Sequence, residues 1–205
     1  MERTGSQVNG ARERLLEAAL TIIRTRGYAD TSIDEICRAA GVTKGAFFHH
    51  FGSKEEMAVA AAAHFSEITR GIFAAAPYRT LEDPLDRVTG YIDFRASRLR
   101  GDIPEFTCLF GTMVQEVYRA HPAIQEACEH GICGRAAEVA KDIEEAKRRY
   151  CPNTPWSAEG LAAHIEAVFQ GAFILSKARG GPEIALECVG HLQRYIELLF
   201  TPDGT

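Results

Sequence analysis

Residues 41–57 read GVTKGAFFHHFGSKEEM, a short segment that combines glycines, two lysines, three phenylalanines and two histidines. Three interpretations of it are open at the outset. The segment is a metal site built on His49 and His50, a piece of hydrophobic core, or a surface that contacts a charged partner. The sequence before and after the segment decides between them.

An amphipathic helix is predicted upstream, over residues 10–26. Its apolar residues recur at helical spacing on one stripe: Leu15, Leu16, Ala19, Leu20 and Ile23. Gly27 follows closely on two arginines and is a suitable C-terminal stop. A shorter helix comes next, because Ser32 and Glu35 form a capping box. Its apolar positions are spaced i, i+3, i+4 and i+7: Ile33, Ile36, Cys37 and Ala40.

The quoted segment predicts a third helix and the start of a fourth. Gly41 ends the preceding helix, and Thr43 caps a short helix that reaches about His50. Ser53 and Glu56 form a second capping box, which opens a long helix. Two short helices joined by a tight, glycine-containing turn are the pattern of a helix-turn-helix, in which the second helix lies in the major groove of DNA.

The rest of the chain also shows helical spacing, so the protein is predicted to be all-α, with about nine helices. Pro77 closes the long helix. The helices expected after it cover residues 81–100, 104–120, 122–150, 158–178 and 183–200. A break in the third of these, near Gly131 or Gly134, is left open.

The composition is that of a soluble globular protein, with 46% hydrophobic and 25% charged residues. No apolar run approaches the ~20 residues that span a bilayer, and the N-terminus lacks an apolar signal segment, so a cytoplasmic protein without membrane contact is expected. Residues 1–52 hold seven Lys/Arg and six Asp/Glu, a charge of +1, whereas the remaining sixteen and twenty-two give −6. This asymmetry fits a small module that meets a polyanion.

Metal, cofactor and enzyme chemistry are not indicated. Adjacent histidines on a helix point ~100° apart, so His49 and His50 are poorly placed to chelate one ion. The six cysteines, at positions 37, 108, 128, 133, 151 and 188, form no CxxC motif and match no zinc framework. The remaining histidines are scattered and join no nucleophile or carboxylate pair in a catalytic motif, so we expect no enzymatic activity.

Residues 26–57, RGYADTSIDEICRAAGVTKGAFFHHFGSKEEM, resemble the N-terminal signature of TetR-type (tetracycline-repressor-like) transcriptional regulators. The resemblance extends over about residues 15–57. It implies a homodimeric regulator, expected to be a repressor, that binds an inverted-repeat operator in double-stranded DNA and is released by a small molecule. It also implies two domains: a helix-turn-helix DNA-binding domain over residues 1–52 and a helical ligand-sensing and dimerisation domain over residues 53–205.

The resemblance assigns DNA contacts to eight positions: Thr31, Ser32, Thr43, Lys44, Gly45, Phe48, His49 and Lys54. Thr31 and Ser32 would contact phosphate through hydroxyl and backbone N–H groups. Lys44 would meet phosphate or base edges at the start of the recognition helix, and Lys54 would anchor another phosphate. Phe48 stands where the family usually has a tyrosine. Because phenylalanine has no hydroxyl, Phe48 can only pack against sugar or a thymine methyl group.

The last two predicted helices carry apolar stripes that suit a dimer interface. The stripe of the first contains Leu161, Ile165, Val168, Phe169 and Ala172, and the stripe of the second contains Ala185, Cys188, Val189, Leu192, Tyr195, Ile196 and Leu199. Two such hairpins from two chains would form a four-helix bundle, as the resemblance implies. The alternative is that both stripes pack only inside one chain.

The middle helices are expected to hold the effector. Candidate pocket residues are Phe106, Cys108, Phe110, Met113, Tyr118, Trp156 and Phe173. Most are apolar, so a small apolar or aromatic effector is expected, although for any single one of them a place in the core is the favoured alternative. A second possibility is a redox- or electrophile-sensing regulator that acts through Cys108, which requires that its thiol ionises.

Overall fold

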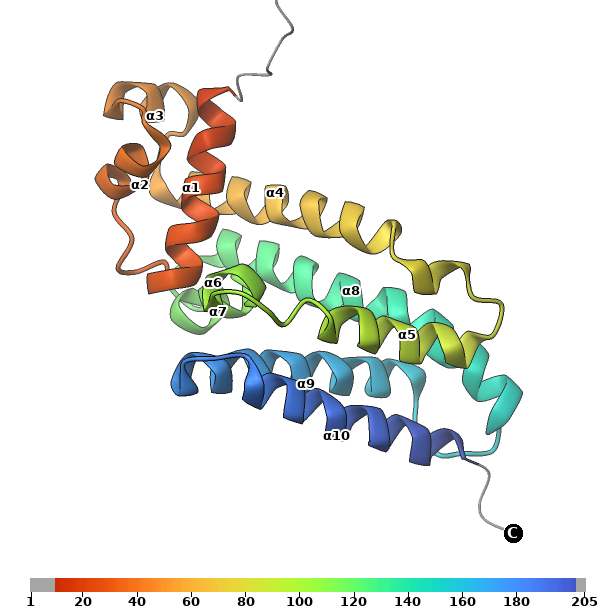
Figure 1. The fold of residues 1–205 in the computed structure, drawn as a ribbon. Helices are drawn as coiled ribbons and strands as arrows, with labels where there is room; N and C mark the ends of the chain where they lie inside the picture. The colour runs from red at the N-terminus through yellow and green to blue at the C-terminus, as the bar shows by residue number, and fades with distance from the viewer. Residues whose placement is uncertain (1–9, 202–205) are drawn as a thin grey trace, which may run out of the picture.

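The computed structural model describes residues 10–201, which form ten α-helices and one short 3-10 helix (Figure 1). In chain order these are α1 (Ala11–Arg26), α2 (Ile33–Ala40), α3 (Lys44–His50), α4 (Lys54–Ala74), η1 (Pro77–Thr80), α5 (Pro84–Ala96), α6 (Ile103–Phe106), α7 (Leu109–Val117), α8 (Pro122–Tyr150), α9 (Ala158–Arg179) and α10 (Glu183–Phe200). The all-α prediction is confirmed, with one α-helix more than the nine expected.

The additional helix arises because residues 104–120 form two helices where one was predicted. Thr107 (ψ 158°) and Cys108 (ψ 126°) are extended and separate α6 from α7. No glycine or proline marks this break, so the sequence pattern did not reveal it. By contrast, α8 runs without a break through Gly131. A Cβ at Gly131 would lie 2.4 Å from the Phe110 ring, so glycine serves close packing here.

The helix caps predicted from the sequence are present at the ends of α2 and at the start of α3. The Ser32–Glu35 capping box is present, with the Ser32 hydroxyl accepting the Glu35 N–H at 3.2 Å. Gly41 adopts the left-handed conformation (φ 64°) that reverses the chain after α2. Thr43 caps α3 through the Ala46 N–H at 3.1 Å.

The second capping box differs in one bond from the prediction. The Ser53 hydroxyl accepts the Glu56 N–H at 3.0 Å, as expected of an N-cap. The Glu56 carboxylate, however, accepts the N–H of Gly52 at 2.8 Å and not that of Ser53. The carboxylate therefore satisfies a donor in the turn between α3 and α4 and ties that turn to the long helix.

The molecule has an N-terminal head, made by α1–α3 and the start of α4, and a longer helical body (Figure 1). In the body α8 packs against α4, α5, α7 and α9, and α9 packs against α10. The apolar core of the head does not end at residue 52: it continues through Met57 and Ala58 of α4 into Leu109 and Met113 of α7. Within residues 10–201, no helix is long and apolar enough to cross a bilayer.

Two adjacent phenylalanines of α3 give a direct test of what holds the head together. Phe47 is 0% exposed, whereas Phe48 is 51% exposed. We expect Phe47→Ala to lower the free energy of unfolding of the head by about 3–5 kcal/mol, because it removes a fully buried ring. Phe48→Ala should change it by no more than about 0.5 kcal/mol. Urea unfolding followed by circular dichroism measures both, and equal losses would contradict this packing.

Candidate functional site

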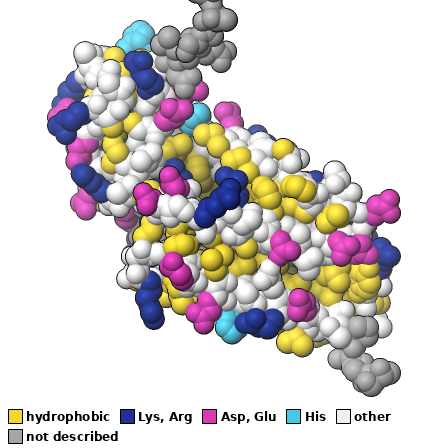
Figure 2. Space-filling model, viewed as in Figure 1, with side chains coloured by type: hydrophobic (Ala, Val, Ile, Leu, Met, Phe, Trp, Pro, Cys, Tyr) yellow, Lys and Arg dark blue, Asp and Glu magenta, His cyan; other side chains and the backbone are white. Residues whose placement is uncertain are grey.

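The first candidate site is the outward surface of α3. Its apolar side, Phe47 and Phe51, packs on α1, and this orients the opposite side away from the protein. The side chains left exposed are those of Thr43, Lys44, Phe48 and His49, together with Gly45. Figure 2 shows basic side chains interspersed with acidic ones on the head. Five of the eight sequence-predicted positions therefore share one exposed surface.

Lys44 is held by one neighbour. Its Nζ lies 2.9 Å from a carboxylate oxygen of Asp34 on α2, and both side chains are well exposed. Ion pairs at such exposed positions contribute about 0–1 kcal/mol and weaken with salt. The Lys44 ammonium group can therefore exchange Asp34 for another anion at little cost.

The other three predicted positions are engaged within the protein. Thr31 is buried; its hydroxyl donates to the Gly27 carbonyl at 2.6 Å and its N–H donates to the Tyr28 carbonyl at 3.2 Å. The Ser32 N–H donates to the Glu35 carboxylate at 3.0 Å. Neither set of groups is free in this conformation, so both residues shape the loop between α1 and α2. The predicted Thr31 hydroxyl contact does not agree with this geometry.

Lys54 sits under the same loop. Its ammonium group lies 4.2 Å from the centroid of the Tyr28 ring and donates to the Ala29 carbonyl at 3.3 Å. Burial lowers the pKa of Lys54, while the charges of Glu116 and Asp30 act in the opposite direction. The lysine thus connects the first turn of α4 to the loop that precedes α2.

A carboxylate of the body also holds this loop. Glu116, on α7, accepts the N–H of Ala29 at 2.7 Å. A Cβ at Gly27 would lie 2.1 Å from this carboxylate, and Gly27 has a positive φ of 93°, so the contact requires glycine. Next to it, the rings of Tyr28 and His121 meet edge to face at 5.3 Å. The head is therefore joined to α7 by polar as well as apolar contacts.

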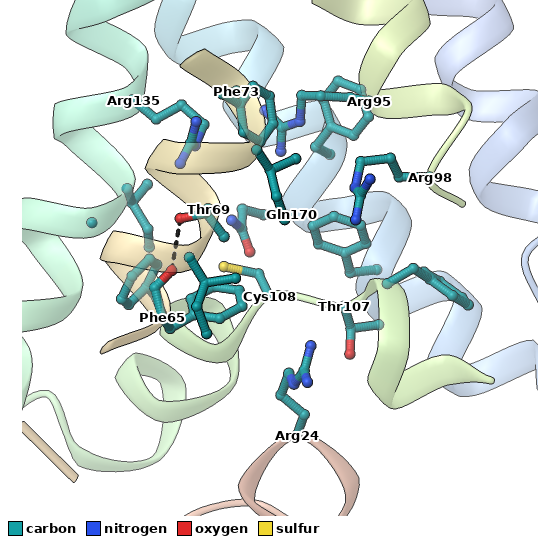
Figure 3. A pocket seen from close by; sticks show the side chains of 18 of the residues that line it. Arg24, Phe65, Thr69, Phe73, Arg95, Arg98, Thr107, Cys108, Arg135 and Gln170 are labelled. Carbon is teal, nitrogen blue, oxygen red and sulfur yellow. Dashed lines mark hydrogen bonds between the residues drawn. The ribbon is translucent and has the colours of Figure 1, made fainter. Parts of the chain in front are cut away.

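The second candidate site is a cavity of about 270 Å³ inside the body (Figure 3). Its lining comes from α1 and from α4 to α9, together with the residues after α5 and the segment between α6 and α7. Four of the predicted pocket residues belong to this lining: Phe106, Cys108, Phe110 and Phe173. Their neighbours include the apolar residues Leu20, Phe65, Ile72, Phe73 and Phe169.

The other three predicted pocket residues lie elsewhere. Met113 is fully buried in the core shared by the head and α7. Tyr118 follows the last turn of α7 and is half exposed. Trp156 packs edge to face on Phe200 at 5.3 Å, with the ammonium group of Lys147 above its ring. Met113 and Tyr118 are therefore not part of the cavity lining, and neither is Trp156, which precedes α9.

The sequence did not indicate that arginines line this cavity. Arg24, Arg95, Arg98 and Arg135 reach it from α1, α5, the residues after α5, and α8. Arg95 forms an ion pair with the buried Glu166, and its guanidinium lies 3.7 Å from the centroid of the Phe169 ring. Because these residues are far apart in the chain, only the fold brings them together.

Tyr91 completes the buried pair. Its hydroxyl donates to Glu166 at 3.1 Å and accepts from Arg95 at 2.9 Å. Burial raises the pKa of Tyr91, which keeps the phenol neutral. Burial acts against the charge of Arg95, but the attraction of Glu166 raises its pKa above the ordinary value. This group fixes the junction of α5 and α9 as a closed polar cluster.

Cys108 is the N-cap residue of α7 and is half-buried. It lines both the cavity and an adjoining hollow of about 240 Å³ that Gln115 and Lys177 also line. Arg24 lines the cavity on one side of Cys108, and Lys177 lines the adjoining hollow. Cys128, in contrast, is buried, and burial raises its pKa to about 12.

Comparison with known proteins places this geometry in a family. A family model described as bacterial regulatory proteins, tetR family, matches residues 15–61. The transcriptional repressor KstR2 of Mycobacterium tuberculosis H37Rv is 38% identical over 96 residues, which are 44% of each chain, so the match spans less than half of that relative. The regulator BetI of Rhizobium meliloti is 27% identical over 195 residues, covering 94% of this chain and 91% of BetI.

Solved structures extend the likeness to the body. A TetR transcriptional regulator from Chloroflexus aurantiacus superposes with a TM-score of 0.80 at 26% identity, covering 91% of this chain and 94% of that one. The reduced form of E. coli NemR gives a TM-score of 0.76 at 21% identity, covering 90% and 95%, which shows a shared fold. The resemblance read from residues 15–57 is thus confirmed, and the matches are to regulators and not to enzymes. The chain belongs to the tetR family of bacterial transcriptional regulators.

Proposed function

We propose that this protein is a homodimeric transcriptional repressor that binds an inverted-repeat operator and leaves it when a small apolar or aromatic effector enters the cavity. The observation that carries the proposal is the exposed surface of α3, held outward by Phe47 and Phe51. Such a helix, presented by a second helix across a tight turn, fits the major groove. Lys44 then supplies charge, and Phe48 supplies an apolar surface for sugar or a thymine methyl group.

Apolar residues that remain exposed or half-buried on α9 and α10 support dimerisation. On α9, Val168 and Leu175 are seven residues apart, about two helical turns, and therefore lie on the same face. On α10, Cys188, Tyr195 and Leu198 recur at i, i+7 and i+10, and Leu198 is 74% exposed. The His164 and Tyr195 rings meet at 5.2 Å, which brings the two faces together. A matching surface from a second chain would bury them in a four-helix bundle.

Two connections support control of the head by the cavity. Helix α1 contributes Leu20 and Arg24 to the cavity wall and packs against α2 and α3. Helix α7, which follows Cys108, holds the loop before α2 through Glu116. A ligand that binds one arrangement of α1 and α7 better than another shifts the population of head positions, and only this difference in affinity drives release.

The surroundings of Cys108 favour a second candidate function, an electrophile-sensing regulator. Cys108 is half-buried at the start of α7, and it shares the cavity lining with Arg24 and the lining of the adjoining hollow with Lys177. Positive charge and a helix N-terminus stabilise a thiolate. If the Cys108 thiol ionises, its thiolate can add to an electron-poor alkene: the S–C bond forms as the C=C π bond breaks, and the resulting carbanion takes a proton from water. The adduct would then occupy the space proposed for the effector.

The first test is DNA binding, measured by fluorescence anisotropy on duplex DNA from upstream of the protein's own gene and on a site selected from random duplexes. We expect tight binding whose affinity falls with salt. Lys44→Ala should weaken it roughly tenfold and reduce the salt slope by about 1. Lys141→Ala, an exposed lysine on α8, serves as the matched control. Equal affinity of both variants and the wild type would contradict the proposed surface.

The second test concerns the dimer. Leu175 on α9 and Leu186 on α10 are similarly exposed, at 42% and 46%, but only Leu175 lies on the shared apolar face. Multi-angle light scattering should give twice the 22.5 kDa chain mass for the wild type and for Leu186→Glu. Leu175→Glu should shift the mass toward that of one chain, because it buries a charge in the interface. A dimeric Leu175→Glu protein would argue against this face.

The third test separates the two modes of control. N-ethylmaleimide should label Cys108 in the native protein and leave Cys128 unmodified, because burial keeps the Cys128 thiol protonated. If Cys108 is the sensor, labelling lowers operator affinity at least about tenfold, and Cys108→Ser abolishes the response. Cys133→Ser, which removes an exposed thiol, should respond like the wild type. Complete labelling of Cys108, verified by mass spectrometry, with unchanged operator affinity would rule out this mode.

A further inference from the structure

The charged groups of the cavity do not balance. Its lining contains four arginines but only two carboxylates, those of Glu105 and Glu166. The Glu166 carboxylate forms an ion pair with Arg95. Glu105 lies at the exposed edge, where its carboxylate accepts the N–H of Asp102 at 3.0 Å. Among residues 10–201, no ion pair is formed by the other three cavity arginines: Arg24, Arg98 and Arg135.

Arg24 forms a single side-chain hydrogen bond to the residues that the structure describes. It is half-buried, its Nε donates to the Leu20 carbonyl at 3.1 Å, and its guanidinium lies 5.6 Å from the centroid of the Phe65 ring. This leaves most of its N–H donors without a partner in the part of the chain that the structure describes. Burial lowers the pKa of Arg24, partly offset by Cys108 and Glu105. A half-buried guanidinium beside aromatic rings is stabilised by an anion whose charged group forms hydrogen bonds to it and whose apolar part packs on the rings.

Thr107 gives an independent indication at the same place. It is only 2% exposed, and its hydroxyl has no hydrogen-bond partner among the described residues. Buried hydroxyl groups are nearly always paired, and leaving one unpaired costs about 1–3 kcal/mol. Thr107 lies in the extended break between α6 and α7, and its oxygen points toward the part of the cavity that Arg24 enters from α1 (Figure 3).

We propose that the cavity binds a small amphipathic carboxylic acid, whose carboxylate is held by the Arg24 guanidinium and the Thr107 hydroxyl and whose apolar body packs on the phenylalanines. This inference rests on the proposed function, since it names the chemical class of its effector. A guanidinium donates two parallel N–H bonds to a carboxylate. The Thr107 hydroxyl donates a further bond and in this way gains the partner that it lacks.

The aromatic walls and the volume of the cavity limit the shape and size of the apolar part of the proposed acid. Phe65 and Phe110 meet edge to face at 5.2 Å, and Phe106 and Phe173 add further aromatic surface. The volume of about 270 Å³ lies at the lower end of ligand pockets, which span roughly 300–1,000 Å³. An aromatic or short branched acid fits this space, whereas a long acyl chain does not.

Calorimetric titration of the purified full-length protein without DNA tests the proposal. The probes are benzoate and 3-phenylpropionate, each compared with the amide of the same skeleton, which keeps the shape and removes the charge. At least one acid should bind, at least about tenfold more tightly than its amide. No binding of either acid up to ~10 mM, or amides that bind as tightly as the acids, would overturn the proposal.

Variants assign the contacts. Arg24→Gln should weaken the acid at least about tenfold without a comparable effect on the amide, whereas Arg12→Gln, which changes an exposed arginine of the same helix, should leave both unchanged. Thr107→Val should weaken the acid several-fold while the thermal midpoint of the ligand-free protein stays the same or rises, because an unpaired buried hydroxyl is removed. Circular dichroism confirms that each variant is folded. Full acid affinity in both cavity variants would refute the assignment.

Two measurements keep this inference distinct from the proposed function. An acid that binds through Arg24 and Thr107 but leaves operator affinity unchanged supports the inference and contradicts effector release. A protein that shows salt-sensitive operator binding but no preference for the acid over its amide supports the regulator and contradicts the inference. The titration without DNA and the anisotropy measurement therefore fail independently.

Discussion

The packing of α1 is the constraint on which the rest of this structure depends. One face of this helix buries Leu15, Leu16, Ala19 and Ile23, which are at most 2% exposed. These side chains meet α2 and α3 on one side and α4 and α7 on the other, in one continuous core. Because protein interiors are close-packed, such a helix cannot shift against the body without moving the head. The direction in which α3 faces is therefore set by contacts that lie mostly outside α3.

Polar groups add direction to this packing. The Glu116 carboxylate and the Lys54 ammonium group both bind the backbone of Ala29, from α7 and α4 respectively. They fix the loop before α2 at two points, in a geometry that apolar contacts alone would leave less defined. In the body, the Arg95–Glu166 pair has the same role between α5 and α9. A buried ion pair contributes little net stability, but removing one partner is costly, so it favours one arrangement of these helices.

The sequence predicted the head in detail because its signals are local. Each helix cap forms hydrogen bonds only to groups within four residues of it. Each predicted cap is found at its expected helix end: Ser32, Gly41, Thr43 and Ser53. The body was predicted only as a set of helices. The break at Thr107 carries no glycine or proline, and the end of α4 at Ala74 is followed by η1, so the positions of α5 to α7 shifted relative to expectation.

The cavity shows why pockets are harder to predict than helices. Aromatic residues near the middle of the chain were a reasonable guide, and Phe106, Phe110 and Phe173 do line the space. The arginines were not foreseen, because Arg24 and Arg135 are separated by more than a hundred residues and each reads as an ordinary helical surface position. Their meeting depends on how α1 and α8 cross the body, which no local pattern encodes.

Arg24 belongs to the same helix that supports the head, and this has a thermodynamic consequence. If a bound acid lowers the affinity of the protein for its operator by some factor, a bound operator lowers the affinity of the protein for the acid by the same factor. DNA then acts as a competitor of the ligand, although the two bind at different places. The concentration of acid needed to free an occupied operator would exceed that needed to fill the unbound protein, so a promoter with a tighter operator would respond at a higher threshold.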